Sequence, residues 1–462
     1  MKKILSVLIV SSLFLLVFSA NAFAVSVRVL LSNATTGITC TIEKGSGYTV
    51  QNRSNGGDVT MTSCQVGDQL VLTSKDQKIN VKINGRDYGT VLGPIVLKTH
   101  GSSDVFGLNG KKYRGSLTFY RGSTLQAVNT LDVEKYLYGV VGKEIGNSVH
   151  LEALKAQAVC SRSFVLANRK PTANYDVTAT TSSQVYHGYT AELETNGGRV
   201  VQAVDATQNK VLYFNQTVVP AYFSANSGGY TETIENVWGP SSQGVPFYAL
   251  PSAGDASTSS YSWTKTLTAQ ELTTLANQYG KTNIGTFKSL KIYREDNQGQ
   301  PTPSGRLYKL EINGTNGTVV ATRDSIRTAL GGLRSTLFTI NNQSSEGVLY
   351  TRGFNTGVLE ISDLSALFGV SKDHNVYAAN GGNREFYVIS KSATYKYAPQ
   401  TSLVETFTGS SFVLEGKGYG HGVGMSQHGA IEMAKNGHTY EEIITYYFMN
   451  DGQDSRFRIA DF

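Results

Sequence analysis

Short alternating runs of apolar and polar residues fill the first part of the chain after residue 24. Val25–Leu31 and Lys78–Ile83 alternate with period two, and clusters such as Asn55–Gly57 separate the runs. This period places apolar side chains on one face of a strand. Residues 25–120 are therefore predicted to form a β-rich N-terminal domain of short strands and turns.

A helical period replaces the alternation at 150–169. Leu151, Leu154, Ala158, Val165 and Leu166 lie near one face at 3.6-residue spacing, and Pro171 ends the run. Further helices are predicted at 268–279, with a capping box of Thr268 and Glu271, and at 324–330, 426–436 and 439–448. Strands are predicted within 200–240 and 287–322, the latter with a turn at Asn313–Gly314.

Residues 341–410 differ in composition and read as an inserted β unit with hairpin-like runs. The predicted class is α+β: a β-rich N-terminal domain, then a mixed α/β core with one long helix, plus the inserted β unit. The predicted division is 1–24 as a signal peptide, 25–120, a core at 121–340, the insertion at 341–410, and 411–462 as the C-terminal part of the core.

The first 24 residues have the features of an export signal. Lys2 and Lys3 precede an apolar run at 4–18, and Ala22–Ala24 supplies the small-x-small pattern at which signal peptidases cut. The alternative is an uncleaved anchor, but 4–18 is short against the roughly 20 apolar residues that a span needs. We expect a secreted, cell-wall-associated protein.

The net charge and the cysteines limit the classes of ligand and chemistry that the sequence supports. Without the signal, 39 Lys and Arg face 35 Asp and Glu, a net charge of +4 with scattered basic residues. This is too weak for a nucleic-acid-binding surface, and no nucleic acid is expected. Cys40 and Cys64 are available to pair in an oxidising compartment. Cys160, in the long helix, is read as a core residue, with a nucleophile as the alternative.

Glu144 is the candidate acid. It stands between glycines and beside Val141 and Ile145, just before the long helix. A carboxyl in such an apolar turn keeps its proton at higher pH, because desolvation disfavours the charged form. Protonating a glycosidic oxygen requires that property. The alternative is a surface Glu near a helix start.

Three further segments carry candidate binding residues. Lys155 and Arg162 are seven apart on one helix, and two cations there suit an anionic sugar substituent or a carboxylate. A second segment, Tyr222–Thr231 with Trp238 following, joins aromatic rings and hydroxyls to glycines that permit close approach. The third is Gly416–Ala430, whose glycines precede a helix. The alternatives are solvated charges and structural turns.

Neither a P-loop ending nor a zinc spacing accompanies the histidines of this last segment, so no metal or other cofactor is expected.

Taken together, these segments resemble the SpoIID/LytB family of stage II sporulation protein D and amidase enhancers. The resemblance is carried in order by Tyr113–Gly115, Val128–Asn129, Glu134–Val141, Glu144, Glu152–Val159, Arg162, Gln184–Tyr186, Ser227–Gly229, Thr231, Val237–Gly239, Ser304–Arg306, Arg327, Ser335–Phe338, and Gly420–Gln427 with Gly429 and Ala430. It covers about 110–340 and 412–450.

The resemblance implies a lytic transglycosylase that cleaves peptidoglycan glycan strands stripped of stem peptides, in cell-wall remodelling linked to sporulation. It implies Glu144 as the acid/base. The residues that it implies for the substrate groove are Lys155, Arg162, Ser227, Gly228, Gly229, His421 and Gln427. Tyr222 and Ser224, from the aromatic and hydroxyl pattern of the second segment, complete the predicted binding residues. We predict that Glu144 and His421 approach each other across one groove.

The chain departs from the family pattern in four places. Proline is missing near Val149–His150, Cys160 replaces a small Ala, and the stretch at 180–183 lacks the Cys and His with which some relatives bind zinc. The insertion at 341–410 is the fourth. Two other functions compete with the enzyme: a wall-binding, non-catalytic enhancer of an N-acetylmuramoyl-L-alanine amidase, with that amidase as partner, and a peptidase that uses Cys160.

Overall fold

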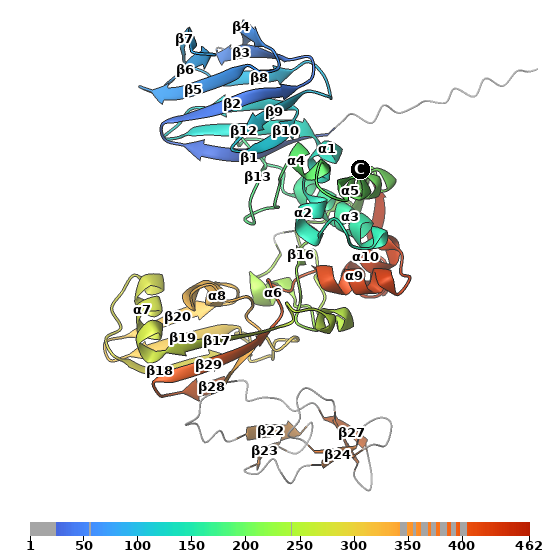
Figure 1. Ribbon diagram of the computed structural model, residues 1–462. Helices are drawn as coiled ribbons and strands as arrows, with labels where there is room; N and C mark the ends of the chain where they lie inside the picture. The colour runs from blue at the N-terminus through green and yellow to red at the C-terminus, as the bar shows by residue number, and fades with distance from the viewer. Residues whose placement is uncertain are drawn as a thin grey trace, which may run out of the picture.

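The computed structural model describes residues 25–54, 57–241, 243–341 and 404–462, and the backbone of six short strands between Leu349 and Tyr397. The predicted signal peptide at 1–24 and most of the predicted insertion lie outside the described residues. Over the described part of the chain, no helix combines the length and hydropathy that a membrane span needs. The class is α+β, as predicted, with β-rich sheets first and a mixed region after them (Figure 1).

Two antiparallel sheets form the N-terminal region. The seven-stranded sheet has the order β13 (Val177–Thr178), β1 (Ser26–Ala34), β12 (Leu125–Asp132), β11 (Ser116–Tyr120), β8 (Ile95–Thr99), β3 (Tyr48–Ser54), β4 (Gly57–Cys64), and only β13 runs parallel to its neighbour. The six-stranded sheet has the order β10 (Lys111–Arg114), β9 (Val105–Leu108), β2 (Gly37–Lys44), β5 (Gln69–Lys75), β6 (Lys78–Ile83), β7 (Arg86–Val91). Alternate residues of both sheets are buried in one core.

The helices gather around α3 (Leu151–Ala167), the predicted long helix. The others in this layer are α1 (Val133–Tyr138), α2 (Val141–Ile145), α4 (Tyr189–Glu192), α5 (Gly197–Ala206), α9 (Gln427–Lys435) and α10 (Tyr440–Phe448). They pack with a sheet of β15 (Thr217–Val218), β14 (Lys210–Phe214) and β31 (Phe457–Asp461). Because β12 leads directly into α1, the N-terminal sheets fix where this layer begins.

A second β region has its own core. One sheet contains β17 (Ser262–Thr268), β29 (Ser411–Lys417) and β21 (Phe338–Asn341), and the other β20 (Thr318–Thr322), β19 (Lys309–Gly314), β18 (Phe287–Tyr293) and β28 (Val404–Phe407). Two helices accompany them, α7 (Ala269–Gly280) and α8 (Ser325–Ala329). The predicted capping box of Thr268 and Glu271 opens α7. Lower in Figure 1 are β22 (Leu349–Gly353), β23 (Gly357–Ile361), β24 (Phe368–Val370), β25 (Val376–Ala378), β26 (Phe386–Ile389) and β27 (Thr394–Tyr397).

Two local predictions were wrong. Residues 200–206, predicted to lie in strands, belong to α5, which buries Val200, Ala203 and Val204 along one face. Asn313–Gly314, predicted as a turn, ends β19, and the chain turns at the next residues before β20.

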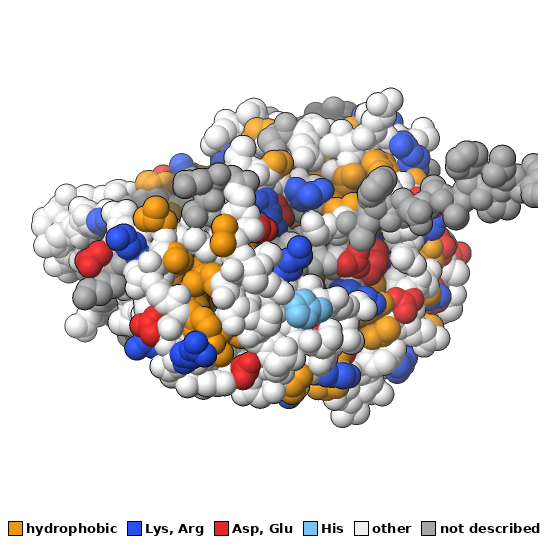
Figure 2. Space-filling model, turned by 90° about the horizontal axis from the view of Figure 1, so that it is seen from above, with side chains coloured by type: hydrophobic (Ala, Val, Ile, Leu, Met, Phe, Trp, Pro, Cys, Tyr) orange, Lys and Arg blue, Asp and Glu red, His pale blue; other side chains and the backbone are white. Residues whose placement is uncertain are grey.

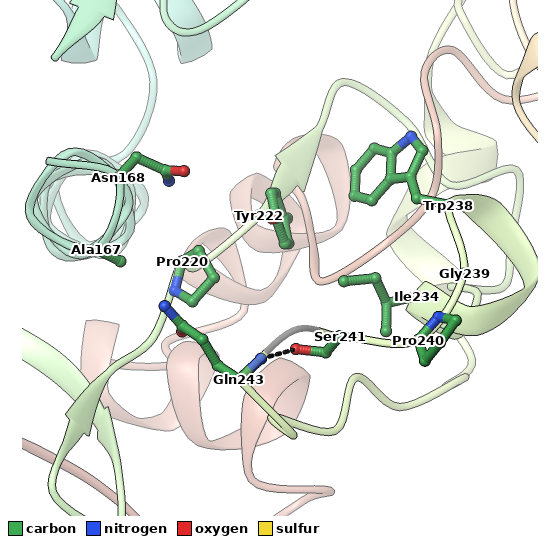
Figure 3. Close-up of a pocket in the computed structure, with 10 residues that line it drawn as sticks. All are labelled: Ala167, Asn168, Pro220, Tyr222, Ile234, Trp238, Gly239, Pro240, Ser241 and Gln243. Atoms are coloured by element: carbon green, nitrogen blue, oxygen red, sulfur yellow. Dashed lines mark hydrogen bonds between the residues drawn. The ribbon is translucent and has the colours of Figure 1, made fainter. Parts of the chain in front are cut away.

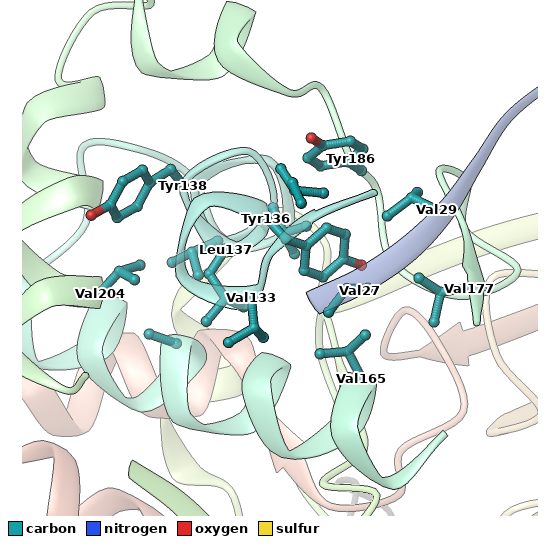
Figure 4. Packing of buried hydrophobic residues seen from close by; sticks show 14 of the residues in the cluster. Val27, Val29, Val133, Tyr136, Leu137, Tyr138, Val165, Val177, Tyr186 and Val204 are labelled. Atoms are coloured by element: carbon teal, nitrogen blue, oxygen red, sulfur yellow. The ribbon is translucent and has the colours of Figure 1, made fainter. Parts of the chain in front are cut away.

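Apolar packing joins the N-terminal sheets to the helical layer. Figure 4 shows Val27 and Val29 of β1 beside Tyr136 of α1 and Val165 of α3, all within one buried cluster. Burying each such side chain contributes about 1.5–3 kcal/mol, so this contact holds the two layers together.

The outer surface carries mixed charge. Figure 2 shows Lys and Arg interspersed with Asp and Glu on the face seen from above. Some of these charges pair, as Arg53 does with Asp58 and Lys112 with Glu43. This agrees with the scattered basic residues of the sequence.

Candidate functional site

Glu144 lies in the short helix α2, and its side chain is half-buried. Gly146 ends this helix at φ 95°, a left-handed conformation that glycine adopts without steric cost. The carboxylate atom Oε1 accepts a hydrogen bond of 2.6 Å from the backbone N–H of Val185. Within the described part of the chain, Oε2 accepts no hydrogen bond, so one oxygen is held and the other is open to a ligand.

The surroundings of Glu144 favour its protonated form. Desolvation by burial raises the pKa of Glu144, and the hydrogen bond from Val185 opposes the rise without cancelling it. A carboxyl that keeps its proton at higher pH can act as a general acid. The sequence predicted this behaviour from the apolar neighbours.

A ladder of aromatic rings fixes the segment that holds Glu144. Phe106, Tyr113, Tyr186 and Tyr136 follow one another at centroid distances of 5.5, 5.6 and 5.0 Å. Tyr186 directly follows Val185, so the ladder runs from the N-terminal sheets to the donor that holds Glu144. The position of the acid therefore depends on the β-rich region as well as on α2.

A buried row of polar groups links this segment to the C-terminal signature. The side chain of Gln184 donates to the Ser161 carbonyl at 3.4 Å, Gln157 donates to Ser161 Oγ at 3.0 Å, and Gln427 donates to Gln157 Oε1 at 3.1 Å. All four residues are buried. Gln427, predicted to line the groove, is thus tied to α3 and connects α9 with the neighbour of Val185.

The third and fourth segments meet in a short parallel pair. Strand β16 (Phe223–Ser224) lies against β30 (Met425–Ser426), and Asn226 pairs with Tyr419. A Cβ on Gly420 would lie 2.7 Å from Ser224 Cβ, which is too close for any other residue. The glycines of the signature are therefore required by this close packing. Ser224 Oγ is buried without a hydrogen-bond partner among the described residues.

The predicted Ser227–Gly229 turn faces a carboxylate of the protein itself. Asp255, fully buried in the 3-10 helix η1 (Ala253–Ser257), accepts hydrogen bonds from the backbone N–H groups of Ser227 and Gly229, each at 3.1 Å. It also accepts from the hydroxyls of Ser227 and Ser426. Gly228 N donates to Asn226 Oδ1 at 2.8 Å. In this structure, the donors of the turn are used within the protein.

Arg306 ties the same two segments from the other side. It is 2% exposed, and its guanidinium donates to the carbonyls of Ser227 at 2.9 Å and Gly420 at 3.3 Å. Burial lowers the pKa of Arg306 to about 10, so it stays charged at neutral pH. A Cβ on Gly422 would lie 2.5 Å from this guanidinium, which explains another glycine of the signature.

His421 is neutral and packs at an angle against two aromatic rings. Burial and the charges of Arg306 and Arg327 lower its pKa to about 3. Its Nδ1 accepts a hydrogen bond of 3.0 Å from Val423 N, which places the proton of the neutral ring on Nε2. The ring lies 4.6 Å from Trp238 and 6.4 Å from Tyr222, between centroids. A neutral imidazole here serves as a stacking and hydrogen-bonding group.

Lys155 and Arg162 lie away from these segments. Lys155 pairs with Glu152 at 2.6 Å, and Glu152 also accepts from Tyr440 N of α10. Arg162 is fully buried and forms a two-pronged ion pair with Glu134 of α1, at 2.8 and 2.5 Å. Both cations therefore have partners within the protein.

A pocket of about 390 Å³ opens beside the end of α3 (Figure 3). We call it the Trp238 pocket. Its lining consists of Ala167, Asn168, Pro220, Tyr222, Ile234, Trp238, Gly239, Pro240, Ser241 and Gln243. Ile234 and Trp238 come from α6 (Ile234–Val237) and the residue after it. Tyr222 is the predicted site residue that this pocket contains.

The alternative chemistries find little support here. Burial raises the pKa of the Cys160 thiol, and its Sγ lies 3.9 Å from the sulfur of Met425. Cys40 and Cys64 are buried and unbonded. Among the described residues, no group of three or more His, Cys, Asp or Glu is placed to hold a metal ion.

The structure therefore brings most of the predicted residues together around β16 and β30, namely Tyr222, Ser224, Ser227, Gly228, Gly229, His421 and Gln427. Glu144 reaches this group through the Gln184–Gln427 row. Over the described residues, no hydrogen bond joins Glu144 directly to His421, so a single groove stays a prediction.

Comparison with known proteins identifies the family. The profile described as "Stage II sporulation protein" (SpoIID) matches residues 121–214, and "Domain of unknown function (DUF8618)" matches 249–358. The amidase enhancer of Bacillus subtilis (strain 168) is 31% identical over 381 residues, which cover 80% of this chain. The chain belongs to the SpoIID family. The 121–214 match contains Glu144, Lys155, Arg162 and Val185.

For two other relatives of this SpoIID-family protein, the alignment covers a larger share of the relative's own length. Stage II sporulation protein D of Bacillus subtilis (strain 168) is 27% identical over 350 residues, 72% of this chain and 77% of that protein. An uncharacterized protein of Brachyspira hyodysenteriae is 28% identical over 382 residues, 81% and 79% of the two chains. The amidase enhancer is longer, and the chain spans about half of it, 48%.

Sequence reasoning missed two organising residues. Asp255 is a single acid among small residues and has no motif around it. Arg306 was noted in Ser304–Arg306, but only as part of the resemblance. Its role as a buried bridge could not be read from spacing.

Proposed function

We propose that this protein cleaves peptidoglycan glycan strands as a lytic transglycosylase, with Glu144 as the acid/base. One observation carries the proposal: a half-buried carboxyl with a raised pKa, one oxygen held by Val185 and the other open. Membership of the SpoIID family supports the same chemistry. The strands expected as substrate are those already stripped of stem peptides.

The reaction needs a single carboxyl. Protonated Glu144 gives its proton to the glycosidic oxygen, and the bond between this oxygen and C1 of muramic acid breaks. The Glu144 carboxylate then takes the proton of the sugar's own 6-hydroxyl, and O6 bonds to C1 to close an anhydro ring. Glu144 ends protonated again, and no water or second carboxylate takes part, unlike in ordinary glycosidases.

The remaining predicted site residues have two roles in this proposal. Tyr222, Ser224, His421 and Gln427 form the wall beside the reacting sugar, with Ser227–Gly229 held behind it by Asp255. Lys155 lies over the ring of Tyr440 in α10, and Arg162 pairs with Glu134 of α1, so the two cations act on the groove through the position of α3.

We also propose export through the predicted signal at 1–24, action at the cell wall, and a role in wall remodelling linked to sporulation. The names of the relatives support this setting. The predicted division at residues 120, 340 and 410 also stays a proposal. The pairing of β12 with β1 and β11 ties the first two units together.

The test uses denuded glycan strands and mass spectrometry of the products. The wild type should release fragments with anhydro ends, and Glu144→Gln should release none. Glu415→Gln, which changes an exposed carboxyl on β29, is the matched control and should cleave like the wild type. Cleavage by Glu144→Gln at the wild-type rate would refute the assignment.

A second function is favoured by one observation, the 31% identity to a protein named amidase enhancer. In that case the protein binds the wall and stimulates an N-acetylmuramoyl-L-alanine amidase without cutting glycans. The same samples decide between the two: neither protein would cleave strands, and both wild type and Glu144→Gln would bind them and stimulate an added amidase.

A further inference from the structure

The Trp238 pocket has a rigid aromatic wall. Trp238 is 43% exposed, although large aromatic side chains are usually covered. It is supported from behind by Tyr222 at 4.9 Å and by His421 at 4.6 Å, between ring centroids. Because these rings hold the indole in place, binding of a ligand against it costs little additional side-chain entropy of the protein.

Polar groups at the rim complement an amide. Asn168 Nδ2 donates to the Phe164 carbonyl at 2.8 Å, which leaves Asn168 Oδ1 as an acceptor toward the pocket. Gln243 lies beside Pro220, and its side chain is exposed (Figure 3). An acetamido group carries one N–H and one carbonyl, so these two side chains match its donor and its acceptor.

The pocket favours a neutral ligand. None of the described residues that line it carries a charge. A hexosamine ring has an apolar face of C–H groups, which packs on the negative face of an aromatic ring, and polar groups at its edge. N-acetylglucosamine fits this chemistry. Muramic acid carries an anionic lactyl group, and none of the described lining residues is a cation; the guanidinium of Arg323, beside Gly239, donates to the Glu235 carbonyl and to Tyr308 Oη.

Helix α3 contacts both the segment that holds Glu144 and the pocket. Ser161 contacts Gln184, the neighbour of the residue that holds Glu144, and Asn168 lines the pocket. Phe164, between them, contacts Tyr222 at 6.0 Å. Seven residues of helix rise about 10.5 Å, so the pocket lies about two turns along α3 from the residue that contacts Gln184.

We infer that the Trp238 pocket is a subsite for an N-acetylglucosamine ring of the glycan strand, with Trp238 as its stacking platform and Asn168 and Gln243 as the groups that recognise the acetamido substituent. The inference rests on the proposed function, because it assigns part of the same strand. It adds a second sugar position, on the Trp238 side of Tyr222, to the reacting position at Glu144.

The probe is a tetramer of N-acetylglucosamine. The chain has two tryptophans, and Trp263 is 8% exposed in the second β region, so Trp263→Phe leaves Trp238 as the only tryptophan, which excitation at the red edge selects over tyrosine. Titration of this variant should give a saturable change in tryptophan emission.

By calorimetry on the otherwise unchanged protein, Trp238→Ala should bind the tetramer about tenfold more weakly, and Trp238→Phe should retain most of the affinity. Phe462→Ala, a partly exposed aromatic outside the pocket, is the control and should bind as the wild type does.

Three outcomes would overturn the subsite: wild-type affinity in Trp238→Ala, an unchanged KM for denuded strands in that variant, or an emission change with a stem peptide but none with the tetramer. Glu144→Gln separates this inference from the proposed function. Tetramer binding retained in Glu144→Gln supports the subsite. A wild type that binds the tetramer at Trp238 but cleaves no strand would refute the enzyme and leave the sugar site standing.

Discussion

The buried pair of Arg162 and Glu134 gives the sharpest test of what holds α3 in place. Arg162 is fully buried and Glu134 is 6% exposed. The guanidinium also donates to the carbonyls of Lys210 at 2.9 Å and Val204 at 3.4 Å. Arg162→Met removes all four hydrogen bonds and leaves the Glu134 carboxylate buried without its cation.

The expected loss in the free energy of unfolding is about 3–5 kcal/mol, the range for breaking one side of a buried ion pair. The double variant Glu134→Leu with Arg162→Met leaves no uncompensated charge, so it should recover most of this loss. With the single variant Glu134→Leu added, the four proteins form a double-mutant cycle that measures the coupling between the two side chains.

Urea denaturation followed by circular dichroism measures these differences. Arg53→Met, which breaks an exposed pair with Asp58, is the control and should not shift the midpoint measurably. A structural role predicts a lower midpoint with an unchanged KM for folded protein. If Arg162→Met unfolds with the wild type and raises only KM, the guanidinium contacts substrate and our reasoning is refuted.

Two further predictions follow from the site. Burial raises the pKa of Glu144, and the acid must be protonated to act. Cleavage should therefore fall as the pH rises through a pKa above the ordinary value for glutamate, about 4.3. A pH–rate profile that declines only below that value would contradict this prediction. Asp255→Asn should lower the free energy of unfolding by about 2–4 kcal/mol, because hydrogen bonds to a charged acceptor contribute about 1.5–3 kcal/mol each and the new amide points N–H groups at existing donors. Thermal denaturation of this variant, with Asp461→Asn as the control, measures the loss. Equal midpoints for the two variants would count against the prediction.

The sequence predicted the elements whose pattern is local. The period of α3, the capping box of α7 and the strands β6 and β14 follow from residues next to one another. The helix α5 was missed because it opens with two glycines and contains Val200 and Val201, which favour strands when no tertiary contact is known. Burial of Val200 against the core decides for the helix.

The sequence identified many of the residues that gather at the site, but it did not predict the contacts that they make. Spacing placed Lys155 and Arg162 on one helix, but it does not tell which element faces them, and both found partners inside the protein. The Ser227–Gly229 turn was recognised as a glycine-rich turn that a ligand could approach closely, yet the acceptor that it binds, Asp255, has no sequence signal. Long-range partners of this kind require the fold.

The parallel pair of β16 and β30 also sets the order in which the molecule can be completed. Ser227 and Ser426 bind the same carboxylate, although the whole second β region lies between them in the sequence. A chain emerging from the ribosome has made Glu144 and Asp255 long before it makes Ser426. Contacts between such distant residues form late, after the loop between them has closed. Any activity that needs both segments therefore appears only after Ser426 has been made and has reached Asp255.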